Sequence, residues 1–243
     1  MTSITKILDN GFQLYKRSFA YILPLVLMDA ILAILINIFI PLHAATPEDL
    51  LNIINENAVS FMLYMLITFI LYSTIFYRIS AIHNKSDINT LTALQEGLKK
   101  LFAIILATVI YFILIFIGFM VIIPGVILLV SLALFTPLII VENASAFEAL
   151  KRSHQMIWKS WWAVASILSI SLFIVMSASM LASGIIQIVF SSSLSPEELM
   201  QLMQFASLTV DKFVSPFFYA VLLLLYYELK GEDKPKNQDG FIA

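Results

Sequence analysis

Long apolar stretches alternate with short polar ones along the whole chain. Several runs of about 20 residues contain almost no charged side chain, and a helix of about that length crosses a hydrocarbon core of about 30 Å. Within these runs apolar and polar residues do not alternate as they do in the strands of a membrane β-barrel. The pattern therefore predicts an all-α, polytopic membrane protein.

Six such runs are expected to form transmembrane helices. They cover about residues 19–42, 59–82, 101–122, 126–141, 162–190 and 208–229. Only Pro124-Gly125 separates the third run from the fourth, which predicts a tight turn between two spans. At 1.5 Å per residue the fourth run reaches only about 24 Å, so this hairpin is expected to be short.

The first run also raises the question of a signal peptide. Residues 19–42 are longer than an apolar signal region, which has about 7–15 residues. A retained first span is therefore expected, and cleavage after His43-Ala44-Ala45 is the alternative.

Polar stretches before three of the hairpins have two-faced helical patterns. Residues 3–18, 90–102 and 145–161 place apolar side chains on one helical face and polar ones on the other. A cationic helix of this kind beside a span typically lies in the headgroup plane. For residues 3–18 a helix that docks against the first span is expected. Ser145 and Glu148 have the spacing of a capping box, which predicts a helix start there.

Two further helix starts belong to an internal similarity. Thr46-Pro-Glu-Asp49 and Ser195-Pro-Glu-Glu198 each combine an N-cap hydroxyl, a first-turn proline and first-turn acids. Residues 46–55 align without gaps to residues 195–204, with a conservative pair at every position. The three inner helices also share a skeleton, namely Leu8-x-x-Gly11, Leu94-x-x-Gly97 and Leu150-x-x-Ser153.

These similarities predict one membrane domain built from three helix-plus-hairpin units. The domain covers residues 1–230, the units cover about 3–82, 89–141 and 144–229, and a polar cytoplasmic tail follows at 231–243. Independent convergence on good capping chemistry is the alternative explanation.

Composition supports the membrane assignment and excludes thiol chemistry. Hydrophobic residues make up 60% of the chain and charged ones 12%, whereas soluble globular chains have about 25% charged residues. The chain has no cysteine, which excludes disulfides, thiol nucleophiles and cysteine-bound zinc or iron–sulfur clusters.

The basic residues predict the orientation. In the six-span arrangement all but one of the 14 Lys and Arg fall on one side, and the exception is Lys212. The opposite loops, 43–58 and 191–206, contain no basic residue and several acidic ones. The positive-inside rule then places both termini in the cytoplasm and Trp158, Trp161 and Trp162 at the inner interface.

Asp29 is the main candidate for intramembrane chemistry. It is the carboxylate deepest in a predicted span, and a central charge costs about 3 kcal/mol on insertion scales. Arg78, near the inner end of the second span, is its predicted ion-pair partner. A structural pair is expected, and a substrate or proton role for Asp29 is the alternative.

No recognised catalytic or metal motif occurs in the sequence. His43, His83 and His154 lack metal-ligand spacing, and there is no G-x-S-x-G, P-loop or H-E-x-x-H sequence. We therefore expect no enzymatic activity, no cofactor and no metal. Membrane lipids are the expected partners, because basic inner helices attract anionic lipid. No nucleic-acid binding is expected.

A short signature lies at the centre of the chain. It consists of an I-I-P-G turn, a span ending in proline and a helix containing A-x-x-R-S. Its residues are Pro124, Gly125, Pro137, Glu142, Arg152 and Ser153. The pattern resembles the YciC-like family of bacterial inner-membrane proteins of unknown function, which is similar to the membrane domain of some glycerophosphodiester phosphodiesterases. The resemblance implies a Gram-negative inner-membrane protein and transfers no catalytic residue.

Two functions follow from these observations. The first is a structural, lipid-associated or accessory role in the inner membrane. The alternative is a transporter or channel for a small or lipidic solute that uses Asp29 and Arg78. A polar cavity that reaches Asp29 would favour transport, and tight packing around an Asp29–Arg78 pair would favour the structural role. An intramembrane enzyme would need a second carboxylate or a histidine beside Asp29.

Overall fold

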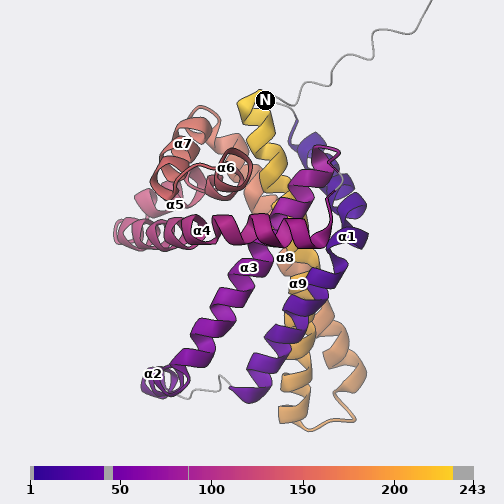
Figure 1. Cartoon of the computed structure of the whole chain (residues 1–243). Coiled ribbons are helices and arrows are strands. Elements are labelled where there is room, and N and C mark those ends of the chain that lie inside the picture. The colour runs from indigo at the N-terminus through magenta and orange to yellow at the C-terminus, as the bar shows by residue number, and fades with distance from the viewer. Residues whose placement is uncertain (1–2, 41–45, 87, 232–243) are drawn as a thin grey trace, which may run out of the picture.

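The computed structural model describes residues 3–40, 46–86 and 88–231, and every regular element in these ranges is a helix (Figure 1). The helices are α1 (Ile4–Phe39), α2 (Pro47–Glu56), α3 (Ala58–His83), α4 (Thr90–Phe119), α5 (Ile123–Ser131), α6 (Phe135–Glu142), α7 (Ala146–Trp158), α8 (Trp161–Phe190) and α9 (Pro196–Lys230). Six segments are long and apolar enough to span a membrane, counting α5 and α6 together. The predicted all-α architecture with six candidate spans is confirmed. The possible cleavage site at 43–45 and the tail beyond residue 231 lie outside the described ranges.

The first amphipathic stretch and the first span form one continuous helix. α1 has 36 residues and so reaches about 54 Å, well beyond a hydrocarbon core of about 30 Å. The apolar face of its first turns packs against α9, beside which it lies in Figure 1. The buried stripe consists of Ile7, Gly11, Leu14 and Ser18. This stretch is therefore packed against α9, and it continues into the first span rather than forming a separate helix.

α4 runs across the direction of α1 and α9 in Figure 1. It crosses α3 closely because small residues face each other there. A Cβ atom added to Gly97 would lie 2.9 Å from Thr74 Oγ1 and 3.0 Å from Ser73 Oγ. The second amphipathic stretch is again part of the same helix as the apolar run that follows it.

The predicted fourth span is broken. α5 ends at Ser131 and α6 begins at Phe135, so two helices of 9 and 8 residues replace one. Each reaches only about 12–13 Å, too short to cross a hydrocarbon core alone. Ser153 of α7 occupies the break: its hydroxyl accepts a hydrogen bond from Leu134 N (3.0 Å) and donates one to Ser131 O (2.9 Å). This side chain supplies hydrogen bonds that a continuous helix would make internally.

The α4–α5 connection is a strained γ-turn followed by Pro124-Gly125. Ile122 has φ +62° and ψ −66°, and Ile123 N donates to Val121 O at 2.7 Å. These are the features of the rare classic γ-turn, which is unfavourable for a β-branched residue. Gly125 is required because a Cβ there would lie 2.7 Å from the Phe119 backbone nitrogen.

The six-span prediction puts this turn on the membrane face opposite Trp161, but the structure places the two side by side. Trp161 donates from its indole Nε1 to the carbonyl of Ile127 at 3.3 Å, and Ile127 follows the turn by only two residues. The turn and Trp161 are therefore neighbours, and they cannot occupy opposite faces of a bilayer about 30 Å thick. The crosswise direction of α4 explains this, because a helix that crosses its neighbours steeply does not carry the chain to their far ends.

The predicted capping box at Ser145 does not form, whereas the two other predicted helix starts have one each. Thr46 and Asp49 exchange hydrogen bonds at the start of α2, and Ser195 and Glu198 do so at the start of α9. Ser145 is the N-cap of α7, but its side chain makes no capping hydrogen bond. α2 ends before α3 begins, whereas α9 continues unbroken from its cap through the span. The three-unit repeat stays a prediction.

Candidate functional site

Asp29 is paired with Lys212 of α9 rather than with Arg78. The distance from Asp29 Oδ2 to Lys212 Nζ is 3.0 Å, and the two side chains are 13% and 17% exposed. Lys212 is the cation that the topology prediction left on the wrong side of the membrane. Its pairing with a buried acid gives it a role within the bilayer, because removing either partner would leave an uncompensated buried charge.

The predicted Asp29–Arg78 pair is wrong because the two residues lie at different depths. The Arg78 guanidinium lies over the ring of Tyr21, 5.6 Å from its centroid, and donates to the carbonyl of Ile88. Tyr21 precedes Asp29 by eight residues, or about 12 Å along α1. Arg78 therefore lies at the level of Tyr21, and Asp29 lies farther along α1.

The ion pair lines a cavity, which we call the Asp29 cavity. It has a volume of about 410 Å³, within the range of small-molecule sites of about 300–1,000 Å³. Helices α1, α3, α4, α6 and α9 form its walls. Besides the pair, it is lined by four tyrosines, two threonines and four apolar residues: Tyr64, Tyr72, Tyr111, Tyr219, Thr68, Thr108, Met65, Phe69, Phe112 and Phe135.

Hydrogen bonds hold the aromatic walls in place. The Tyr72 hydroxyl donates to Thr136 Oγ1 at 2.9 Å, and the Tyr111 hydroxyl donates to the carbonyl of Leu129 at 2.9 Å. The rings of Tyr72 and Tyr219 meet edge to face, with centroids 4.9 Å apart. The cavity is therefore largely preformed, which reduces the ordering cost of binding.

Two polar atoms of the Asp29 cavity are not satisfied by the protein. Asp29 Oδ1 and Thr68 Oγ1 are buried and have no hydrogen-bond partner within the described part of the chain. A buried polar atom without a partner costs about 1–3 kcal/mol. The carboxylate oxygen can only accept a hydrogen bond, so the partner that it lacks is a donor group such as an amine or hydroxyl.

A second carboxylate lies near the pair but faces another pocket. Asp211 interacts electrostatically with Asp29, and it lines a pocket of about 360 Å³ with Ser179 of α8 and other residues. Together the two carboxylates outnumber the single ammonium of Lys212. Because Asp29 and Asp211 line different pockets, they are not arranged as an acid–base pair around one substrate.

The signature residues Glu142, Arg152 and Ser153 lie in α6 and α7, and the first two form an ion pair. Glu142, the last residue of α6, forms ion pairs with Arg152 of α7 and with Lys230 of α9, the latter at 3.2 Å. The Tyr226 hydroxyl donates to Glu142 Oε1 at 2.6 Å. We call these four residues the Glu142 cluster. It connects three helices, and Ser153 lies next to Arg152 in the α5–α6 break.

The other signature residues shape the backbone. Pro124 and Gly125 follow the γ-turn, and Pro137 is the third residue of α6, where a first-turn amide needs no helical acceptor. None of the signature residues lines the Asp29 cavity.

Sequence reasoning missed Lys212, Lys230 and Tyr226. For Lys212 a signal was present, since it was the one basic residue outside the predicted inner side. Lys230 and Tyr226 looked like ordinary interfacial residues. Among the residues that the structure describes, no group of His, Cys, Asp and Glu is arranged to hold a metal ion.

Comparison with known proteins identifies a family whose function is unknown. The family model described as a domain of unknown function, DUF7847, matches residues 97–229, which is more than half of the chain. The chain therefore belongs to this family. The matched range contains the Glu142 cluster except Lys230, and it contains Lys212 but not Asp29. No curated protein and no solved structure matches.

Proposed function

We propose that this member of the DUF7847 family binds a small amphipathic solute within the membrane, in the manner of a transporter, and that the Asp29 cavity is its binding site. The observation that carries the proposal is the pair of unsatisfied buried atoms, Asp29 Oδ1 and Thr68 Oγ1, which belong to two residues that line one cavity. A purely structural ion pair would be expected to have its remaining lone pairs satisfied by neighbouring donors.

The position of the cavity indicates what kind of solute enters. Met65 and Phe112 on its wall are 58% and 63% exposed, so this side of the cavity opens on the outer surface of the helix bundle. In a membrane that surface faces lipid. A molecule with an apolar part and an amine or hydroxyl group could reach Asp29 laterally from the bilayer.

A structural role has its own support elsewhere in the molecule. The Glu142 cluster is a compact ion-pair network that joins α6, α7 and α9, and it contains two of the six signature residues. It gives those two residues a structural role, and none of its members lines the Asp29 cavity. The two roles therefore belong to different places in the protein.

The test compares molecules that copurify with full-length variants. Mass spectrometry should detect a bound molecule in the wild type and lose it in Thr68→Val, which removes a hydroxyl while leaving the ion pair intact. Asp29→Asn should also lose it. Asp9→Asn, an exposed acid on the same helix, is the matched control and should retain it.

Unfolding temperatures separate loss of binding from loss of structure. Asp29→Asn leaves Lys212 unpaired, so the double variant Asp29→Asn/Lys212→Met provides a folded reference without a buried unpaired charge. An identical set of bound molecules in the wild type, Thr68→Val and the double variant would refute the proposed function.

A further inference from the structure

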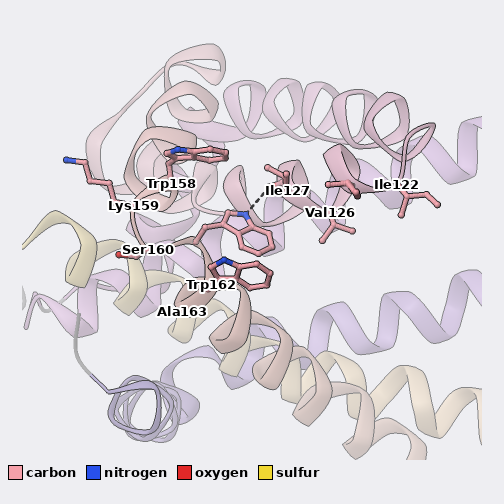
Figure 2. Close-up of a pocket in the computed structure, with 10 residues that line it drawn as sticks. Ile122, Val126, Ile127, Trp158, Lys159, Ser160, Trp162 and Ala163 are labelled. Atoms are coloured by element: carbon pink, nitrogen blue, oxygen red, sulfur yellow. Dashed lines mark hydrogen bonds between the residues drawn. The ribbon is translucent and has the colours of Figure 1, made fainter.

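The three tryptophans of the chain lie together in one cleft, far along the sequence from Asp29. The cleft has a volume of about 810 Å³ and lies between α5 and the α7–α8 connection. Figure 2 shows it in close-up. It is lined by Ile122, Ile123, Val126, Ile127, Trp158, Lys159, Ser160, Trp161, Trp162 and Ala163. We call it the tryptophan cleft.

One tryptophan side chain is held by a hydrogen bond, and the other two are largely exposed. Trp161 is held by its hydrogen bond to the Ile127 carbonyl, drawn as a dashed line in Figure 2. Trp162 meets it edge to face at 4.8 Å and is 80% exposed, while Trp158 is 57% exposed. Two large aromatic surfaces are thus exposed beside one anchored indole, and tryptophan is favoured at membrane–water interfaces.

The cleft has a charged end and an apolar end. In Figure 2 Lys159 and Ser160 lie at one end, and Ile122 lies at the other beyond Val126 and Ile127. Lys159 is exposed, and its ammonium forms no ion pair with any residue in the described ranges. Ile122, in the strained γ-turn, is 68% exposed.

We infer that the tryptophan cleft binds one anionic phospholipid, with an acyl chain along the isoleucine wall and the phosphate at Lys159. The polarity along the cleft matches that of a lipid, since a basic side chain attracts anionic headgroups and the rest of the wall is apolar. The indoles suit the boundary between these two regions. This site is independent of the Asp29 cavity and of the solute proposed to bind there.

The tryptophan content makes the inference directly testable. Because the chain has 3 Trp and all line the cleft, its total tryptophan emission reports on this site. The full chain is reconstituted in phosphatidylcholine vesicles that contain increasing mole fractions of either brominated phosphatidylglycerol or brominated phosphatidylcholine. Bromine on the acyl chain quenches nearby indoles. The anionic lipid should reach half-maximal quenching at an about fivefold lower mole fraction, the effect of one lysine contact of about 1 kcal/mol.

Two lysine variants, one in α7 and one at its C-terminal end, provide the comparison. Lys159→Gln should abolish the preference for phosphatidylglycerol. Lys151→Gln removes an exposed charge of α7 that does not line the cleft, and it should keep the preference. Soluble glycerol phosphate should not reverse the quenching, because the acyl chain supplies much of the binding.

Three results would overturn the inference. Equal quenching by the two brominated lipids would show contact with bulk lipid only. Equal effects of the two lysine variants would show general surface attraction. Reversal by glycerol phosphate would show a phosphate site without a lipid chain. Unchanged unfolding temperatures of the two variants confirm that the comparison is made on folded protein.

Discussion

At the scale of single residues, Ser153 shows how one small polar side chain allows a helix to break inside a membrane protein. Its hydroxyl is fully buried and bonds both sides of the interruption between α5 and α6. Unpaired peptide groups are costly in an apolar environment, so irregular backbone occurs there only where the protein satisfies it. Position 153 therefore needs a hydroxyl group that accepts one hydrogen bond and donates another, although it lies within the regular helix α7.

We expect Ser153→Ala to destabilise the protein by about 1–3 kcal/mol, because it leaves the Leu134 amide and the Ser131 carbonyl without this partner. Ser166→Ala is the matched control, since the Ser166 hydroxyl bonds only the Trp162 carbonyl of its own helix and is exposed. Thermal unfolding in detergent measures both. Equal, small effects would mean that the break is stable without the serine.

At the scale of helices, the crossing of α3 and α4 depends on small residues. Gly97 lies against the Ser73 and Thr74 side chains. A Cβ atom added to Gly97 would also lie 3.0 Å from the Thr74 backbone nitrogen. A backbone neighbour cannot move aside as the end of a side chain can. Gly97 is therefore needed for the close approach, and the crossing fixes how the α4–α5 hairpin is attached to the bundle.

Gly97→Ala should destabilise the protein or displace α4, even though alanine is the better helix former by about 1 kcal/mol. Gly184→Ala is the control, because an added Cβ there meets no heavy atom within 4 Å, and it should be neutral or stabilising. Comparing the two unfolding temperatures isolates the packing effect. A stabilised Gly97→Ala would contradict the crossing described here.

At the scale of the whole molecule, the central hairpin departs from the up-and-down arrangement of the other spans. α1 and α9 lie side by side, and the end of α3 meets the end of α9 where Asn84 bonds the Tyr227 hydroxyl at 2.9 Å. α4 runs across them, and its far end returns to the neighbourhood of Trp161. The candidate spans are thus six by length and composition, but they do not share one direction.

Because the chain has no cysteine, single cysteines can map this arrangement without a background signal. With the predicted orientation, Ser193→Cys between α8 and α9 should react with a membrane-impermeant maleimide added to intact cells. Ser86→Cys, after α3, should react only after permeabilisation. Met120→Cys, at the α4–α5 turn, should not react from outside. If Met120→Cys reacts from outside as Ser193→Cys does, the α4–α5 turn lies on the outer face and the crosswise arrangement is wrong.

Apolar runs and capping chemistry were sufficient to predict the helical architecture. Each candidate span contains enough apolar residues to be recognised from its own sequence, and the N-caps at Thr46 and Ser195 act through residues only three positions away. The signature included Glu142 and Arg152, but their shared ion pair was not predicted. The resemblance to the YciC-like family and the three-unit repeat stay predictions.

The tertiary structure decided those features that depend on how the helices are placed relative to one another, namely the ion pairs and the cavities. The partner of Asp29 is Lys212 because pairing in a bundle requires equal depth and facing sides, and neither quantity is encoded near Asp29 in the chain. The break between α5 and α6, which Ser153 stabilises, and the crosswise direction of α4 both depend on contacts between residues distant in sequence. The sequence by itself determined that the chain forms helices long and apolar enough to span a membrane, since the hydropathy of a segment depends only on its own residues. Only the packing decided which charges meet and where cavities remain.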